Sequence, residues 1–140
     1  MKEAYSPEVQ SKKIEELHFE LQSWKSNLSF IKDEIKFIDH LLNSYVFQPN
    51  TPNLFERLQD YQHRLKKMKK QKTELQKAIS KHENNLGGMM ECTDKSCDLQ
   101  YYTKHDVLKA KTVDYISGFR NLKSEIFNYA GVILKKRRPV

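Results

Sequence analysis

Helix-breaking residues and cysteines are scarce in this sequence. Its 140 residues include four glycines and four prolines, which are too few for the many turns of an all-β fold. No apolar run approaches the roughly 18 residues that cross a membrane, and residues 1–7 lack the apolar core of a secretory signal. Cys92 and Cys97 are then expected to be free thiols in a reducing compartment. We therefore expect one cytoplasmic helical domain that does not enter a membrane.

Signatures of catalysis are also missing. The sequence contains no glycine-rich phosphate-binding loop, no recognisable pair of a nucleophile and a base, and no helix-turn-helix or other module that reads nucleic acid. Its net charge of +7 favours attraction to acidic partners but carries no information about the fold. We expect a protein that is not an enzyme and that has no cofactor.

Three long stretches of the chain carry unbroken heptad patterns. Clusters of turn-forming residues at 48–53 and 84–88 separate them. Within each stretch, seam residues recur at alternating steps of three and four, which is typical of helices that pack at a coiled-coil angle. The first seam consists of Ile14, Leu17, Leu21, Trp24, Leu28, Ile31, Ile35, Ile38, Leu42 and Tyr45. The second consists of Leu54, Leu58, Tyr61, Leu65, Met68, Lys72, Leu75, Ile79, His82 and Leu86. The third consists of His105, Leu108, Thr112, Tyr115, Phe119, Leu122, Ile126, Tyr129 and Ile133.

These seams predict an all-α fold, a long antiparallel three-helix bundle. We expect helices at about residues 7–48, 52–86 and 103–136, a connection over 87–103 and a basic C-terminal tail at 135–140. Short turns force neighbouring helices to run antiparallel, so the layers of the core can be paired by counting from the first turn.

The layer count makes two specific pairings. It places Trp24 opposite Leu75 and Thr112. It places Leu17 opposite His82 and His105, at the end of the bundle where the 87–103 connection is expected. Lys72 is a polar member of the second seam, and its aliphatic stem can pack while its ammonium group reaches the edge of the core.

Part of the chain resembles a family of small, uncharacterised bacterial coiled-coil proteins. The resemblance rests on the segment Glu15-Glu16-Leu17-His18-Phe19-Glu20, followed by Trp24 and Lys32-Asp33-Glu34-Ile35, and on Leu122-Lys123-Ser124-Glu125 with Phe127 near the other end. It implies a helical fold and brings no activity or site residue with it.

A group of cysteines and histidines is the first candidate site. His82 and His105 flank the expected connection, which contains Cys92 and Cys97. Two thiolates and two imidazoles would complete a tetrahedral zinc site. The alternative, which we favour, is that the histidines form a polar layer that sets helix register while the cysteines take no part.

A basic run in the second helix is the next candidate. It contains Arg64, Lys66, Lys67, Lys69 and Lys70. Other basic residues fall at similar heights in the bundle, namely Lys25, Lys32, Lys36, Arg120 and Lys123. Together they could form a positive band that holds nucleic-acid phosphates without reading sequence. The alternative is a solvated, lysine-rich helix face.

Apolar residues that lie off the seams are the last candidate. They are Phe30, Phe37, Ile116, Phe127 and Leu134. A three-helix bundle buries one stripe per helix, so extra stripes must widen the core, be covered by residues 87–103, or meet another chain. The function that we predict is a non-enzymatic helical interaction or structural module, with a second copy or another helical protein as its partner. Nucleic-acid binding and metal binding are the alternatives.

Overall fold

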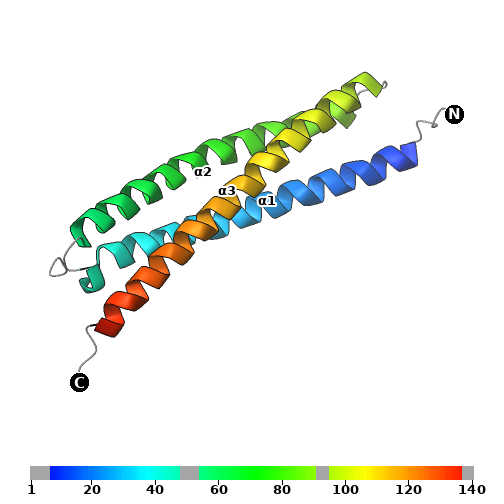
Figure 1. The fold of residues 1–140 in the computed structure, drawn as a ribbon. Helices are drawn as coiled ribbons and strands as arrows, with labels where there is room; N and C mark the ends of the chain where they lie inside the picture. The colour runs from blue at the N-terminus through cyan, green and yellow to red at the C-terminus, as the bar shows by residue number, and fades with distance from the viewer. Residues whose placement is uncertain (1–6, 48–53, 91–94, 137–140) are drawn as a thin grey trace.

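The computed structural model describes residues 7–47, 54–90 and 95–136 of the chain. The element order is α1 (Pro7–Leu42), a 3₁₀ turn η1 (Tyr45–Phe47), α2 (Leu54–Met90) and α3 (Lys95–Lys136). The helices α1 and α3 run in one direction and α2 runs in the other (Figure 1). The prediction of an all-α, antiparallel three-helix bundle is therefore confirmed. Among the residues described, no helix has both the length and the apolar character needed to cross a bilayer.

The helix α1 ends earlier than predicted. It stops at Leu42 rather than near residue 48, and side chains just beyond it satisfy the free carbonyls of its last turn. Asn43 Nδ2 donates to the carbonyl oxygen of Asp39 at 2.8 Å, and Ser44 Oγ donates to that of Leu41 at 2.6 Å. The turn η1 follows, and its Val46 and Phe47 side chains are buried in the core.

The prediction of a non-helical connection over residues 87–103 is wrong. The helix α2 continues through Gly87 and Gly88 to Met90, and α3 begins at Lys95. Glycine lowers helix propensity, but the helix continues past both glycines, directly after the buried Leu86. Of the basic tail, Lys135 and Lys136 belong to the end of α3, and 137–140 lie outside the described residues.

The core follows the predicted seams closely. Among the buried side chains, those with the lowest exposure are Leu21, Leu28, Ile38, Leu42, Leu54, Tyr61, Ile79, Thr112, Phe119, Leu122 and Ile126. The seam residues Lys72, His82 and His105 are buried as well. Both α1 and α3 pack along α2, whereas α1 and α3 contact each other at fewer places. The helix α2 is therefore the common neighbour of the other two.

Two tyrosines of α3 fix its register against α2. Tyr101 Oη donates to the carbonyl oxygen of His82 at 2.9 Å, and Tyr115 Oη donates to that of Met68 at 2.8 Å. The two tyrosines are two heptads apart in α3, and their two acceptors are two heptads apart in α2. The predicted pairing of His82 with His105 across the same interface is also present.

The layer count is wrong for α1. Lys25 Nζ lies 2.9 Å from Glu83 Oε1, and the Trp24 ring stacks on His105 with 4.7 Å between centroids. Trp24 therefore shares a layer with the histidines rather than with Leu75. The pairing of core layers assumes that the first helix continues to Tyr45 and that the chain then turns directly into the second helix. The turn η1 fills that end of the bundle instead, so α1 lies further toward the C-terminal end of α2.

Candidate interaction surfaces and the buried histidine layer

A polar and aromatic layer crosses the core near the C-terminal end of α2. It consists of Trp24, His82, Tyr101 and His105, which we call the histidine layer. His82 Nε2 lies 3.0 Å from His105 Nδ1. The rings of His82 and Tyr101 are stacked with 4.0 Å between centroids, and those of Trp24 and His105 with 4.7 Å. The layer therefore brings together side chains from all three helices.

A carboxylate at the surface of α1 completes this layer. Glu20 Oε1 lies 3.0 Å from His105 Nε2, and Glu20 Oε2 lies 3.0 Å from Lys109 Nζ. A carboxylate only accepts, so His105 Nε2 donates to Glu20. When His105 is neutral, its Nδ1 accepts a hydrogen bond from His82 Nε2. The buried imidazoles thus form one continuous hydrogen-bonded chain from α2 through α3 to α1.

Burial determines the charge of one end of this chain, and hydrogen bonds determine the charge of the other. Desolvation, together with the nearby His105 and Lys104, lowers the pKa of His82 to about 4. His82 is therefore neutral at neutral pH. Partial burial would raise the pKa of Glu20, but hydrogen bonds from Lys109 and His105 lower it overall. Glu20 is therefore the negative end of the chain.

The arrangement fits the register layer better than the zinc site. His82 and His105 do come together, but their facing nitrogens are bonded to each other and the remaining His105 nitrogen is bonded to Glu20. In the part of the chain that the structure describes, no three His, Cys, Asp or Glu side chains are grouped as metal ligands. Cys92 lies outside that part, and Cys97 belongs to the first turn of α3.

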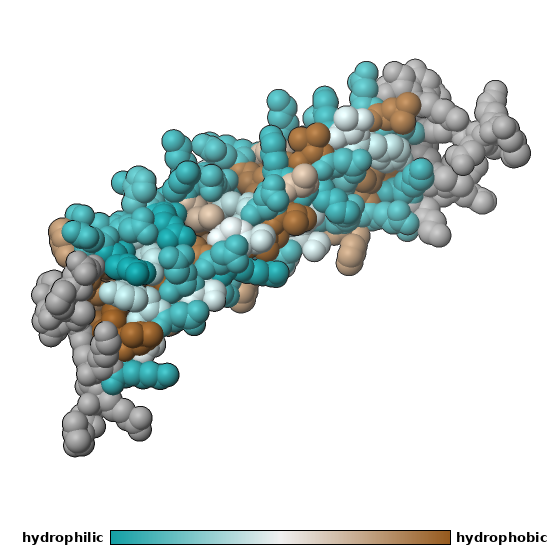
Figure 2. Space-filling view, viewed as in Figure 1, coloured by the Kyte–Doolittle hydropathy of each residue, from teal (hydrophilic) through white to brown (hydrophobic). Residues whose placement is uncertain are grey.

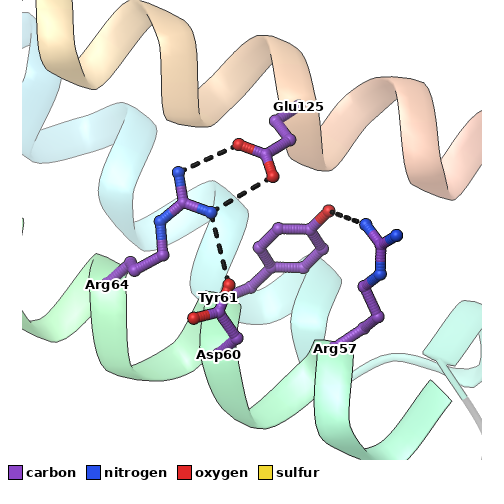
Figure 3. Close-up of polar contacts among 5 residues, drawn as sticks. All are labelled: Arg57, Asp60, Tyr61, Arg64 and Glu125. Atoms are coloured by element: carbon purple, nitrogen blue, oxygen red, sulfur yellow. Dashed lines mark hydrogen bonds and ion pairs between the residues drawn. The ribbon is translucent and has the colours of Figure 1, made fainter. Parts of the chain in front are cut away.

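The basic run of α2 is divided among different environments. Figure 3 shows the Arg64 guanidinium between Asp60 of its own helix and Glu125 of α3. Its Nη1 and Nη2 atoms lie 3.2 and 2.9 Å from the two carboxylate oxygens of Glu125. This bidentate pair joins α2 to α3. The guanidinium of Arg64 is therefore engaged within the bundle and is not free for a phosphate.

The lysines of that run point to two sides of α2. Lys66 and Lys69 line a groove between α1 and α2, whereas Lys67 and Lys70 are exposed outside it. Two lysines of the predicted band are paired with carboxylates of neighbouring helices, Lys25 with Glu83 and Lys123 with Glu34. The lysines of the run therefore face more than one side of α2, and two lysines of the predicted band are held by carboxylates of the bundle.

The off-seam apolar residues are mostly exposed. Phe30 and Phe37 on α1 are 64% and 61% exposed, and Phe127 and Leu134 on α3 are 39% and 45% exposed. The rings of Phe37 and Phe127 meet edge to face, with 6.2 Å between centroids. Ile116 differs from these four, since it is half-buried and packs against the core. In Figure 2 hydrophobic residues form an interrupted line along α3, with hydrophilic residues on both sides.

Sequence reasoning missed Tyr101 as a member of the histidine layer, and Glu20 and Lys109 as the charged residues beside it. Tyr101 fell within the expected connection, although it lies four residues before His105 and so on the same helix face. Glu20 lies four residues before Trp24 in the same way. Glu20 could have been identified from two features together. It is an acidic residue one helical turn from the seam residue Trp24, and it lies opposite the seam residue His105.

Comparison of the chain with models of known protein families, with curated proteins and with solved structures found no match.

Proposed function

We propose that the chain is a non-enzymatic helical interaction module that forms a dimer with a second copy of itself. The contact surface consists of Phe30, Phe37, Phe127 and Leu134, which we call the apolar face. Ile116 is left out because it packs against the core. The proposal includes the cytoplasmic setting expected from the sequence, and it assigns the protein no catalytic step.

The pair of exposed phenylalanines from two helices is the observation that supports the proposal most. Phe37 and Phe127 are separated by 90 positions in the sequence but touch on the surface. A side chain of this size gains roughly 1.5–3 kcal/mol when it is removed from water. Contiguous exposed apolar groups of this kind are typical of binding surfaces.

The spacing of these residues favours another helix as the occupant. Phe30 and Phe37 are one heptad apart, as are Phe127 and Leu134, and this spacing matches the contact positions of a packed helix. The helices α1 and α3 contact each other at fewer places than either contacts α2, and a partner helix would lie along the side where Phe37 meets Phe127. A second copy presents the same face, so a symmetric dimer closes with both faces covered.

The mass of the protein in solution tests this proposal. Light scattering at concentrations on the order of tens of micromolar should give about twice the chain mass of 16.7 kDa. Phe30→Glu with Phe37→Glu should reduce the mass to that of one chain while the helix content stays unchanged. Charges placed in an apolar contact are costly to desolvate, and both positions are exposed in the monomer.

Phe55 provides the matched control. It lies in the first turn of α2 and is 60% exposed, much like Phe30 and Phe37, but it is not part of the apolar face. Phe55→Glu should leave the dimer intact. A monomeric mass for the unmodified protein would refute the proposal, and equal dissociation by Phe55→Glu would refute the assignment of the face.

A further inference from the structure

A groove between α1 and α2 gathers five lysines from the two helices. Its volume is about 530 Å³, which is within the usual range for sites that bind small molecules. The lysines that line it are Lys32, Lys36, Lys66, Lys69 and Lys72. Ile35 and Leu65 contribute apolar surface, and Asp39 and Gln62 are its other polar members. One carboxylate therefore stands against five ammonium groups.

These lysines differ from Lys25 and Lys123 of the neighbouring surface. Lys25 and Lys123 are paired with Glu83 and Glu34. Within the described ranges, no ion pair joins any of the five groove lysines to a carboxylate. The positive charge of the groove is thus not neutralised by the bundle itself, and it lies in a concave site where an anion would contact several ammonium groups together.

Lys72 gives the groove a built-in, partly desolvated charge. It occupies a seam position of α2 and is only 6% exposed, and no hydrogen bond joins its Nζ to another described residue. Burial, followed by repulsion from Lys32, Lys69 and Lys36, lowers its pKa. Its aliphatic stem packs in the core while its ammonium group reaches the groove. Partial desolvation of that charge is unfavourable for folding. Leucine or methionine would fill this seam position without that cost.

We propose that this groove binds a compact anion that carries several phosphate groups in a row. Lys32 and Lys36 would contact it from α1, and Lys66 and Lys69 from α2. Lys72 would contact it from the floor of the groove. The bound anion would supply the countercharge that the fold leaves out, and its binding involves no covalent step.

The distribution of charge favours a compact anion over a nucleic-acid backbone. Extended phosphate backbones need positive charge along a continuous surface, but Lys67 and Lys70 lie outside the groove and Arg64 is held by Glu125. The five lysines converge on one site instead. A short phosphate chain, either free or as part of a nucleotide, can place its charges within that site.

Calorimetric titration of the full chain with inorganic tripolyphosphate tests the proposal. At about 50 mM salt, where screening is modest, we expect saturable binding of one tripolyphosphate per chain. Lys36→Gln with Lys69→Gln should weaken binding by about tenfold or more. Lys67→Gln with Lys70→Gln removes the same charge from α2 outside the groove and should change affinity by no more than about twofold. ATP should compete with tripolyphosphate for the site.

A substitution of Lys72 separates binding from folding. Lys72→Met keeps the packing of the stem and removes the partly desolvated charge, so it should raise the melting temperature while weakening tripolyphosphate binding. A stabilised variant that binds as well as the unmodified protein would overturn the role of Lys72. The absence of saturable binding by the unmodified protein, or equal losses in the two double variants, would overturn the site. A DNA duplex that binds more tightly than tripolyphosphate and depends equally on Lys67 and Lys70 would show that nucleic acid is the occupant.

Discussion

The two ends of the bundle are both filled with aromatic rings, but different forces hold them. At the histidine layer, hydrogen bonds of 3.0 Å connect His82 to His105 and His105 to Glu20 through the core. At the other end, Phe47 and Tyr61 pack around Tyr129, with ring centroids 6.2 and 5.9 Å from it. We call this second group the turn-end cluster, because Phe47 belongs to η1.

The difference between the two ends lies in how strongly each fixes the positions of the helices. A chain of buried donors and acceptors is satisfied only in one register, since a slip would leave polar groups unpaired at a cost of about 1–3 kcal/mol each. Ring contacts tolerate small slips because dispersion has little directionality. We therefore infer that the histidine layer specifies the register of all three helices and that the turn-end cluster mainly adds apolar burial.

Removal of the Trp24 ring should produce the largest loss at the histidine layer. Trp24 is 6% exposed and stacks on His105, so Trp24→Ala leaves a cavity and uncovers the imidazole. We expect the free energy of unfolding to fall by roughly 3–5 kcal/mol, measured by urea denaturation. Phe19→Ala is the control on the same helix, because Phe19 is 75% exposed and its removal should cost less than about 0.5 kcal/mol. Similar losses for the two variants would contradict the placement of Trp24.

Acid should weaken the histidine layer before it affects the turn-end cluster. The pKa of His82 is about 4 in the folded chain, against an ordinary value of 6.5. Between pH 6.5 and about 5 the unfolded chain therefore binds a proton at His82 that the folded chain does not. The stabilisation from neutral His82 is fully present above the unfolded pKa and decreases as the pH falls. The free energy of unfolding should therefore be about 2 kcal/mol lower at pH 5 than above pH 6.5.

His82→Phe isolates this pH effect. The phenyl ring can keep the stack on Tyr101 but has no proton to bind, so the variant should lose less stability than the unmodified protein between pH 6.5 and about 5. Denaturation at several pH values measures both slopes. Parallel slopes for the two proteins would show that other groups cause the acid sensitivity.

A pair of tyrosine hydroxyls gives the smallest and most direct comparison of the two ends. Tyr101 Oη donates to a buried carbonyl at 2.9 Å, whereas Tyr61 Oη accepts a long contact of 3.4 Å from Arg57. Tyr101→Phe should lower the free energy of unfolding by about 1 kcal/mol, and Tyr61→Phe by less than about 0.5 kcal/mol. The same measurement serves both variants, and a larger effect at Tyr61 would reverse the assignment of polar and apolar ends.

The heptad pattern was sufficient to predict three helices and most of the core, because burial of a seam depends mainly on its period. It also predicted the contact of His82 with His105, since both residues are seam members at the end where α2 leads into α3. It failed for the position of α1, because the packing of η1 depends on the bulk of Phe47 and not on a period. The sequence analysis placed Lys32 and Lys36 at the height of Lys66 and Lys69, but it did not predict the groove. Which lysines line a groove and which are paired with carboxylates depends on side-chain contacts between helices.

Because α2 is the common neighbour of α1 and α3, most of the packing joins helices that follow one another in the sequence. Only residues 91–94 separate α2 from α3, so bringing these two helices together costs little chain entropy. Proteins whose contacts are mainly local in sequence fold quickly. Either helical hairpin, α1 with α2 or α2 with α3, can form first, and the remaining helix then packs against the α2 of that hairpin. The chain therefore has two short routes to the folded bundle.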